Sequence, residues 1–332
     1  MNRLNFSPND GNLSRMVRYR RRMLLVAAFG LFLLLIQPCG YASQNPVVLL
    51  SSGSAPVYQQ VSRDFQSYLA ESCRENSANC IQNPIILLTQ ERDDERIYFP
   101  PDTRLIITLG QRAAEMVHKM NTELPILHAL IPRLAYQRLG KIKNHSVIFL
   151  DQPIRRQLRL AKIIRPDPHV GLLLSRITKA IQHEIMTEAA KLGIPVSYRH
   201  VDDVEMIGPL LTAVLEESNI LLALPDPVIF NRTTIFNILL SSYHNQIPVI
   251  GFSAAYVQAG ALIAAYSTPA DIARHLAEYT RDYLTADTEE LPDPTYPKYF
   301  SIAVNRSVAR SLGISLPDEA DILRLLLEEG NP

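Results

Sequence analysis

Asp226 and Ser253 are the polar residues of this chain whose positions point most directly to ligand chemistry. Asp226 lies between two prolines after the apolar segment Ile220 to Leu224, and Ser253 follows the apolar segment Pro248 to Phe252. Both segments have the composition of buried strands, and the amphipathic stretch between them predicts a helix. A strand–helix–strand unit implies a parallel sheet, in which ligands lie beyond the carboxyl ends of the strands. The two residues therefore stand where a small molecule would be held.

Residues 251–255 occupy the place of a hydrolase nucleophile elbow without having its sequence. The motif requires glycine where Ala255 stands, and it requires an acid and a histidine later in the chain. Asp271 and His275 follow, but they lie one turn apart on one predicted helix, which would not easily aim His275 at Ser253. The eight histidines are scattered, and the chain has no His-Glu-x-x-His, Gly-x-Gly-x-x-Gly or phosphate-loop motif. We therefore expect no enzymatic activity, no cofactor and no metal site.

The N-terminus has the pattern of a secretory signal peptide. Five arginines between Arg15 and Arg22 precede the apolar run Met23 to Ile36, and small residues follow up to Ser43. The run is shorter than the roughly 20 apolar residues of a transmembrane helix. We expect cleavage and a periplasmic or otherwise extracytoplasmic location. An uncleaved anchor stays an alternative, and Pro38 before Cys39 disfavours a lipoprotein signal.

Charge and cysteine content narrow the partners of the cleaved chain. Residues 1–43 carry six of the 33 basic residues and one of the 33 acidic residues, so 27 basic and 32 acidic residues remain, a net charge of −5. This balance, without a basic cluster, argues against a nucleic-acid surface. Cys73 and Cys80 also remain, and in an oxidising compartment we expect them to form a disulfide across a short loop.

The rest of the chain alternates short apolar strands with amphipathic helices, in two series. The first series predicts strands at residues 47–50, 85–88, 104–108, 125–130 and 147–150, and helices at 56–72 and 111–120. The second predicts strands at residues 170–174, 195–200, 220–224, 248–252 and 261–266, and helices at 152–164, 178–192 and 206–217. Helices at 268–284 and 317–329 and a strand at 300–305 follow.

Two such series predict an α/β protein with two doubly wound parallel-sheet lobes joined by a hinge. We expect a signal peptide at residues 1–43, a first lobe from 44–147 plus 268–287, and a second lobe from 148–267 plus 298–332. The Pro-rich acidic stretch at 288–297 then serves as a crossing linker. Several crossings between lobes predict a ligand cleft between them and hinge closure around the ligand.

Five segments, which are spread over most of the chain after Leu105, carry a resemblance to a known family. They are LIITLGQRAAE (105–115), FLDQPIRRQLRLAKIIRP (149–166), LALPDPVIFNRTTIFNILLSSY (222–243), IPVIGFSAAYVQAGALIAAYS (247–267) and FSIAVNRSVARSLGISLP (300–317). With these segments the sequence resembles the ABC-transporter substrate-binding proteins with the type I periplasmic-binding fold. The resemblance is to the subgroup related to tryptophan and tyrosine binders.

The resemblance implies a monomer that captures a small, amino-acid-like ligand between its lobes and delivers it to a membrane permease. By position it implies ligand contacts at Ser51, Ser52, Gly110 and Gln111 in the first lobe, and at Ser175, Asp226, Asn231 and Ser253 in the second. Serine hydroxyls and the N–H groups at helix starts can hold a carboxylate, and Asp226 can accept from an ammonium group. Aromatic walls for an apolar side chain would come from Tyr58, Phe230 and Tyr256.

Each of these residues also has a purely structural interpretation, which stays open here. Asp226 would cap the helix that follows, and Gly110 and the two serines of the first lobe would shape tight turns. Asn231 would be a surface residue, and the aromatic residues of the second lobe would belong to its core. A second function also stays open, a ligand-sensing or ligandless module that signals through a separate membrane receptor.

Overall fold

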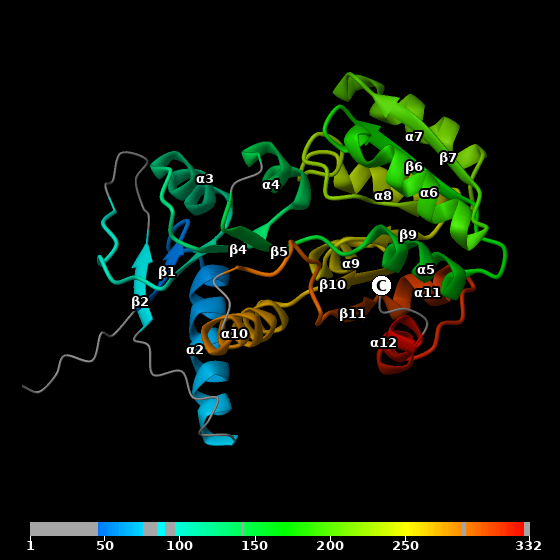
Figure 1. Ribbon diagram of the computed structural model, residues 1–332. Helices are drawn as coiled ribbons and strands as arrows, with labels where there is room; N and C mark the ends of the chain where they lie inside the picture. Colours follow the sequence, from blue (N-terminus) through cyan, green and yellow to red (C-terminus); the bar gives the residue numbers. More distant parts are fainter. Residues whose placement is uncertain (1–45, 76–84, 90–96, 141–142, 287–289, 329–332) are drawn as a thin grey trace, which may run out of the picture. The chain divides into compact units, whose positions relative to one another are not determined.

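Two mainly parallel β-sheets with helices on their faces form the framework of the protein (Figure 1). A computed structural model describes residues 46–75, 85–89, 97–140, 143–286 and 290–328, which fall in one compact unit, Asn45–Pro332. The predicted signal peptide at residues 1–43 lies outside the described residues. Cys80 and the side chain of Cys73 also lie outside them, so the predicted disulfide stays a prediction.

The first sheet has the strand order β2-β1-β3-β4-β5, with every neighbouring pair parallel. Its strands are β1 (Val47–Ser51), β2 (Ile85–Thr89), β3 (Leu105–Leu109), β4 (Ile126–Ile131) and β5 (His145–Phe149). Its helices are α2 (Pro56–Glu75), α3 (Gln111–Met120), α4 (Arg133–Leu139) and α10 (Pro269–Thr285). Successive side chains of a strand point to opposite sides, so alternate residues of β1 pack on opposite faces of the sheet.

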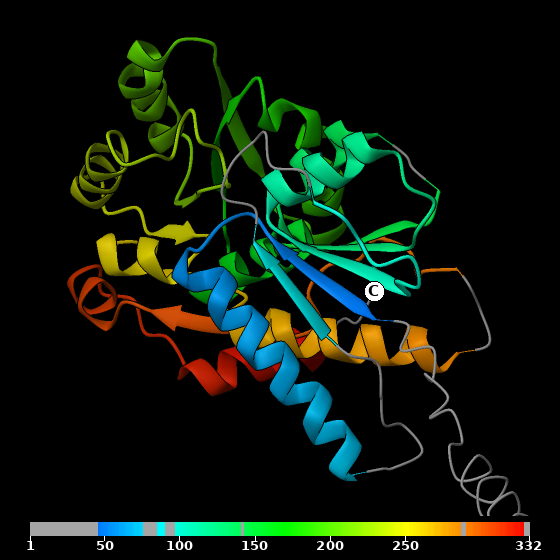
Figure 2. The same ribbon diagram turned by 90° about the vertical axis from the view of Figure 1, so that its left-hand side faces the viewer.

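Helices cover both faces of this first sheet. Val47 and Leu49 belong to a core that also contains residues of α2 and α10, such as Phe65 and Leu276. Leu50 packs on the opposite face with residues of α3. Helices α2 and α10 pack against each other, as Figure 2 shows, although almost 200 residues separate them in the chain. The late helix α10 thus packs with the first series of elements.

The second sheet has the order β11-β10-β9-β8-β6-β7. Its strands are β6 (Val170–Ser175), β7 (Val196–Val201), β8 (Ile220–Leu222), β9 (Val249–Gly251), β10 (Ile263–Tyr266) and β11 (Ser301–Val304). Its helices are α5 (Ile154–Ile164), α6 (Gln182–Leu192), α7 (Ile207–Glu216), α8 (Ile235–His244), α9 (Ala254–Ala259), α11 (Arg306–Ser311) and α12 (Glu319–Glu328), with 3-10 turns η2 (Thr178–Ile181) and η3 (Val204–Met206). Residues of α5, α6 and α12 share a core on one face, and those of α7 and α8 share a core on the other.

Three details differ from the sequence expectations. Strand β11 pairs antiparallel with β10, so the second sheet is not wholly parallel. Helix α4 occupies residues for which the sequence predicted no element. Helix α8 begins only at Ile235, because residues 227–234 form turns in which Asn231 and Thr234 bond to neighbouring backbone groups.

Three connecting segments run between the elements of the two sheets, and hydrogen bonds join them. The first follows β5, the second joins β10 to α10, and the third leads from α10 back to β11. Gln152 Nε2 of the first segment donates to Ser267 Oγ of the second at 2.9 Å. Ser267 Oγ in turn donates to the carbonyl oxygen of Tyr299 in the third segment at 2.8 Å. One serine therefore links all three connections.

Candidate functional site

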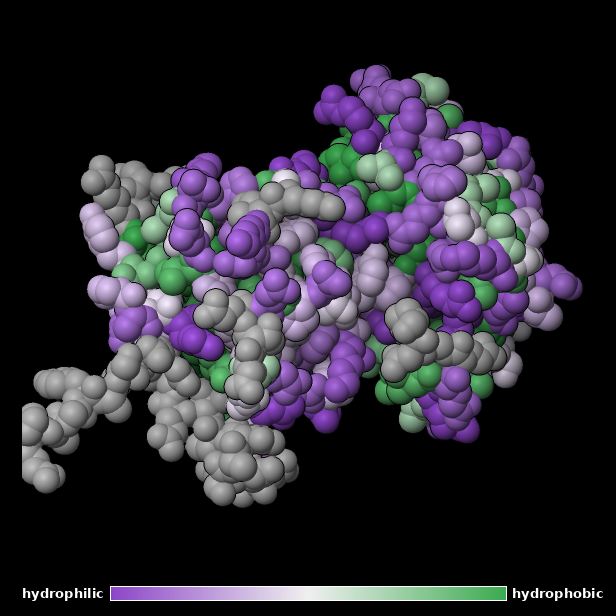
Figure 3. Space-filling model, viewed as in Figure 1, coloured by the Kyte–Doolittle hydropathy of each residue, from purple (hydrophilic) through white to green (hydrophobic). Residues whose placement is uncertain are grey.

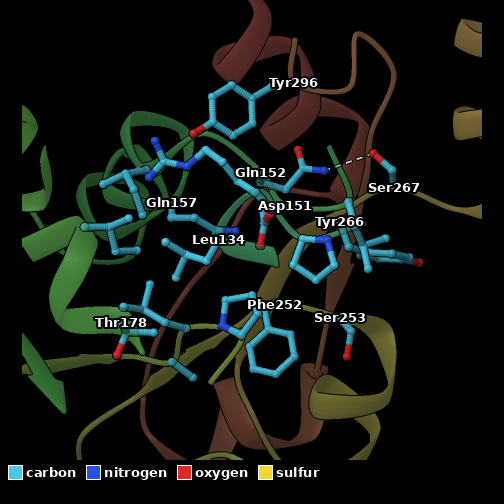
Figure 4. A pocket seen from close by; sticks show the side chains of 18 residues that line it. Leu134, Asp151, Gln152, Gln157, Thr178, Phe252, Ser253, Tyr266, Ser267 and Tyr296 are labelled. Carbon is cyan, nitrogen blue, oxygen red and sulfur yellow. Dashed lines mark hydrogen bonds between the residues drawn. The ribbon is translucent and has the colours of Figure 1, made fainter. Parts of the chain in front are cut away.

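A pocket of about 250 Å³ lies where the carboxyl ends of strands from both sheets meet (Figure 4). From the first sheet it is lined by residues that follow β4 and β5, namely Pro132, Arg133, Leu134, Leu150 and Asp151, and by Tyr296. From the second sheet it is lined by Thr178, Ile181, Ala223, Leu224, Pro225, Phe252, Ser253, Tyr266 and Ser267, with Gln152, Ile154 and Gln157 between the two groups. Within each sheet the lining segments lie together because parallel strands have their carboxyl ends at the same edge.

The walls of the pocket are mainly apolar, and the polar groups are few. Figure 4 shows Tyr296 and Gln152 on one side of the space, with Phe252 and Ser253 on the opposite side. Burial raises the pKa of Tyr296 to about 12, so its hydroxyl stays protonated at neutral pH. An apolar pocket with a few convergent polar groups is the usual form of a small-molecule site.

Asp151 is the carboxylate of this pocket. It is the second residue after β5, and its Oδ2 accepts a hydrogen bond from the backbone N–H of Arg133 at the start of α4. Burial raises the pKa of the Asp151 carboxyl, while the Arg133 N–H and the Arg133 charge lower it by smaller amounts. A carboxylate in so poorly hydrated a place is stabilised by a cation or by further hydrogen-bond donors.

The guanidinium of Arg133 already has a partner of its own. Its Nη2 lies 2.5 Å from Glu184 Oε2 on α6. The same guanidinium also lies over the ring of Tyr296, at 6.0 Å from the ring centroid. Arg133 and Glu184 therefore largely neutralise each other beside the pocket.

Gln157 of α5 brings a buried amide to the pocket wall. Its side chain is 5% exposed, and its Nε2 donates to the carbonyl oxygen of Ala265 at 3.4 Å. Its Oε1 is buried and accepts no hydrogen bond in the structure. Leaving such an acceptor unpaired costs about 1–3 kcal/mol, so a donor that reached Gln157 Oε1 would stabilise the site.

Ser253 occupies the N-cap position of the short helix α9. Its Oγ accepts from the backbone N–H of Tyr256 at 3.4 Å, as a capping serine does. Of the predicted contact residues, all of which lie in the described part of the chain, Ser253 lines the pocket and the others do not. The hydrogen bond that Ser253 Oγ accepts from the Tyr256 N–H therefore holds the serine at the edge of the pocket.

The predicted contacts of the first sheet form a group of their own at the ends of β1 and β3. Ser52 Oγ accepts from the Ala113 N–H at 2.8 Å, and Ser51 Oγ lies 3.1 Å from the carbonyl oxygen of Gly53. Gly110 adopts φ +92, and a Cβ there would lie 2.6 Å from Tyr58 Oη. The turn therefore requires glycine. Gln111 Nε2 donates to Glu115 Oε1 at 2.6 Å on the surface of α3.

The predicted contacts of the second sheet form another group around Asp226. Asp226 is 1% exposed, and its Oδ2 accepts from Thr178 Oγ1 at 2.6 Å and from the Ser175 N–H at 3.3 Å. Its Oδ1 accepts from the N–H groups of Val228 at 2.9 Å and Ile229 at 3.4 Å. The carboxylate thus closes the turn after Pro227, rather than capping helix α8.

Phe230, Asn231 and Tyr256 lie close to that turn. The Tyr256 hydroxyl donates to the carbonyl oxygen of Phe230 at 2.6 Å, and the two rings pack edge to face at 6.5 Å. Tyr256 also packs on Phe252, with ring centroids 4.2 Å apart, so it supports a residue of the pocket wall. Asn231 Nδ2 donates to the carbonyl oxygens of Pro227 and Val228, each at 3.1 Å.

Sequence reasoning missed the residues that follow β4, β5 and β10. Arg133, Asp151 and Ser267 stand at carboxyl ends in the same way as Asp226 and Ser253 do. The rule that ligands lie beyond strand ends would have found them, had it been applied to every predicted strand. Gln157 gives no such signal, because it belongs to the buried face of α5.

Within the described ranges, no group of three or more His, Cys, Asp or Glu side chains is placed to hold a metal ion. None of the helices in the described part of the chain has the length and apolar character needed to cross a membrane. The face drawn in Figure 3 is mostly hydrophilic, with smaller hydrophobic patches between the polar side chains.

The protein is similar in structure to several proteins whose structures have been solved. No protein-family model matches the chain, and no curated protein matches it. An ABC domain from Streptococcus pneumonia in complex with L-Trp is 18% identical with a TM-score of 0.54, over 84% of this chain and 97% of the other. A ligand-free, open substrate-binding protein with adhesive properties from Clostridium difficile is 15% identical with a TM-score of 0.63, over 82% of this chain and 96% of the other.

A further solved structure extends the likeness. A periplasmic ribose ABC transporter protein from Conexibacter woesei is 10% identical with a TM-score of 0.50, over 84% of this chain and 97% of the other. Similarity at these identities concerns the fold alone. The chain has the two-lobed α/β fold of the type I periplasmic-binding proteins.

Proposed function

We propose that this protein is the exported solute-binding component of an ABC-type import system. The observation that carries the proposal is the mainly apolar pocket lined from both sheets, in a fold shared with substrate-binding proteins. A solute in this pocket contacts both lobes at once, so binding favours the arrangement in which the lobes close on it. A membrane permease would then receive the solute.

The same proposal assigns the parts of the chain. Residues 44–147 plus 268–287 form the first lobe, residues 148–267 plus 298–332 form the second, and 288–297 cross between them. The packing of α10 against α2 supports the return of the chain to the first lobe. We also propose that residues 1–43 are a signal peptide, that Cys73 and Cys80 form a disulfide, and that the protein has no enzymatic activity.

A thermal-shift screen of Asn45–Pro332 against amino acids, amines, small acids, sugars and nucleosides tests the proposal. This unit contains the hydrophobic cores of both sheets. A ligand at about 100 times its Kd adds about 2.7 kcal/mol of stability, a shift of a few degrees at this size. A screen in which no compound raises the Tm would overturn the proposal.

The chain contains no tryptophan, so one introduced tryptophan can locate the binding site. Leu150 lines the pocket and is 41% exposed, so Leu150→Trp puts a fluorophore there with little strain. Leu327 on α12 is 52% exposed and lies outside the pocket lining, and Leu327→Trp is the matched control. We expect a screening hit to change the emission of the first variant and leave that of the second unchanged. Equal responses would contradict the assigned pocket.

A further inference from the structure

From the polar groups of this pocket we infer that its solute is a small aromatic or aliphatic amine without a carboxylate, bound with its ammonium group toward Asp151 and Gln157. The inference rests on the proposed function and names the class of solute. It differs from the amino-acid-like ligand expected from the sequence. Its basis is the balance of donors and acceptors around the pocket.

The size of the pocket limits the solute to about one ring with a short chain. The pocket volume is about 250 Å³. An apolar cavity of about 150 Å³ holds a benzene molecule, so the remaining space admits a few further atoms. Apolar walls such as Leu134, Leu224 and Phe252 suit the ring or alkyl body of such a molecule.

The charges beside the pocket favour a cation. Among the described residues that line it, Asp151 is the one carboxylate and Arg133 the one cationic side chain. Because Arg133 is paired with Glu184 at 2.5 Å, its guanidinium would have to leave that partner to hold a ligand carboxylate. Among the described residues no cationic side chain forms an ion pair with Asp151, and the hydrogen bond that it accepts from Arg133 comes from the backbone N–H. An ammonium group would supply a charge-assisted hydrogen bond there.

Gln157 adds a neutral acceptor to the same wall. Its buried Oε1 has no donor in the structure, and its Nε2 bond to Ala265 is long at 3.4 Å, so the amide is only weakly held in its present orientation. An ammonium group has three donors and no acceptor, which matches a pocket lined by one carboxylate and by a glutamine whose carbonyl oxygen is unpaired. A carboxylate ligand would instead face two acceptors.

Calorimetric titration of Asn45–Pro332 with phenylpropylamine, phenylpropionate and phenylpropanol tests the inference. The three probes have nearly the same body and differ in their end group. We expect the amine to bind about tenfold or more tightly than the other two. Across the thermal-shift library we likewise expect amines to raise the Tm more than acids do. This second comparison remains informative if a different ring or alkyl group fits the pocket better than phenylpropyl does.

Substitutions at Asp151 and Gln157 test whether these two residues cause the preference for the amine probe. Asp151→Asn keeps an oxygen for the Arg133 N–H and removes the charge. The ratio of the affinity for the amine to that for the other two probes should therefore fall to near one. Gln157→Met keeps the volume and removes the acceptor, and we expect about a fivefold loss of amine affinity. Gln59→Met on the exposed surface of α2 is the matched control and should bind as the unaltered protein does.

The outcomes separate the two claims. Acids or neutral compounds that outrank amines overturn the inference and leave solute binding in place. An amine preference that survives Asp151→Asn also overturns it, since the charge would then come from elsewhere. A library in which nothing binds removes the proposed function itself.

Discussion

Asp226 shows how a single buried carboxylate can fix the end of the second sheet. Its two oxygens accept from Thr178, Ser175, Val228 and Ile229, which joins the segment after β6 to the segment after β8. Both segments contribute residues to the pocket wall. The position of that wall therefore depends on a residue that the pocket itself does not include.

Asp226→Ala should lower the free energy of unfolding by about 3 kcal/mol, because it leaves buried donors without an acceptor. Urea denaturation of Asn45–Pro332 measures the loss. Asp282→Ala is the control, since Asp282 forms a surface ion pair with Arg281 and its side chain is 65% exposed. That variant should change stability by less than about 0.5 kcal/mol. Equal stability of both variants would contradict the role given to Asp226.

His128 and His145 form a buried pair in the first sheet that should make the protein sensitive to acid. Thr108 Oγ1 lies 2.7 Å from His128 Nδ1, and His128 Nε2 lies 3.2 Å from His145 Nδ1. His118 and the ring of Tyr136 also face His128. Burial, with smaller repulsion from His145 and His118, lowers the pKa of His128 from 6.5 to about 3. Burial and His118 lower the pKa of His145 to about 4.

Stability should therefore fall as the pH drops below 6.5, the ordinary histidine pKa. The unfolded chain takes up protons there, whereas the folded protein stays neutral at both residues until the pH nears their lowered pKa values. At pH 5 the loss from His128 alone is about 2 kcal/mol. Urea denaturation between pH 7.5 and 4.5 measures it, and His145→Gln should flatten the pH dependence. The exposed His183→Gln is the control, and a flat profile in the unaltered protein would contradict the prediction.

The sequence predicted the strand-end position of Ser253 because local pattern alone defines a strand and the residue directly after it. The partners of Asp226 could not be predicted in this way, since Thr178 and Ser175 lie about 50 residues earlier in the chain. Gln157 was missed for a related reason. A glutamine on a predicted helix is ordinarily exposed, and only packing shows that this one is buried without a partner for its Oε1.

Arg159 ties helix α12 to helix α5 at the level of whole elements. The Arg159 side chain is 7% exposed, and it donates to the carbonyl oxygens of Leu325 and Leu326 at 2.6 and 2.7 Å. These carbonyls belong to the last turn of α12, where helical partners are missing. A positive charge at a helix C-terminus also interacts favourably with the helix dipole.

Arg159→Met should loosen α12 and lower the free energy of unfolding by about 2–3 kcal/mol. Amide hydrogen exchange should rise first in α12, because the variant removes the donors for its last carbonyls. Arg155→Met on the same helix is the control, since Arg155 is 47% exposed and pairs with Glu188 at 3.6 Å. Unchanged exchange in α12 would show that apolar packing alone holds the helix.

At this scale the sequence predicted most elements, because period and length define a strand or a helix locally. Helix α3 has the predicted bounds. The pattern failed where tertiary structure decides. The turns of residues 227–234 depend on the buried Asp226 carboxylate, and the antiparallel β11 depends on which edge strand it meets. Helix α4 was missed because seven residues carry little periodicity.

For the whole molecule, the connection built on Ser267 links the pocket to any movement between the sheets. Ser267 lines the pocket, accepts from Gln152 and donates to Tyr299, so all three connecting segments meet at one pocket residue. A solute that contacts both walls can shift the arrangement of the lobes only by binding one arrangement better than another. The pocket lies beside the segments that such a shift would bend.

Solute binding should therefore reduce the radius of gyration of Asn45–Pro332, measured by small-angle X-ray scattering at saturating concentrations of a screening hit. The expected reason is that both walls contact the solute only when the lobes close on it. Ser267→Ala removes both hydrogen bonds of the Ser267 hydroxyl and keeps the apolar walls of the pocket. It should keep the compaction, while the protein without solute samples a wider range of arrangements and binds more weakly. A hit that raises the Tm at an unchanged radius would contradict closure, and it would mean that the solute occupies a pocket already formed.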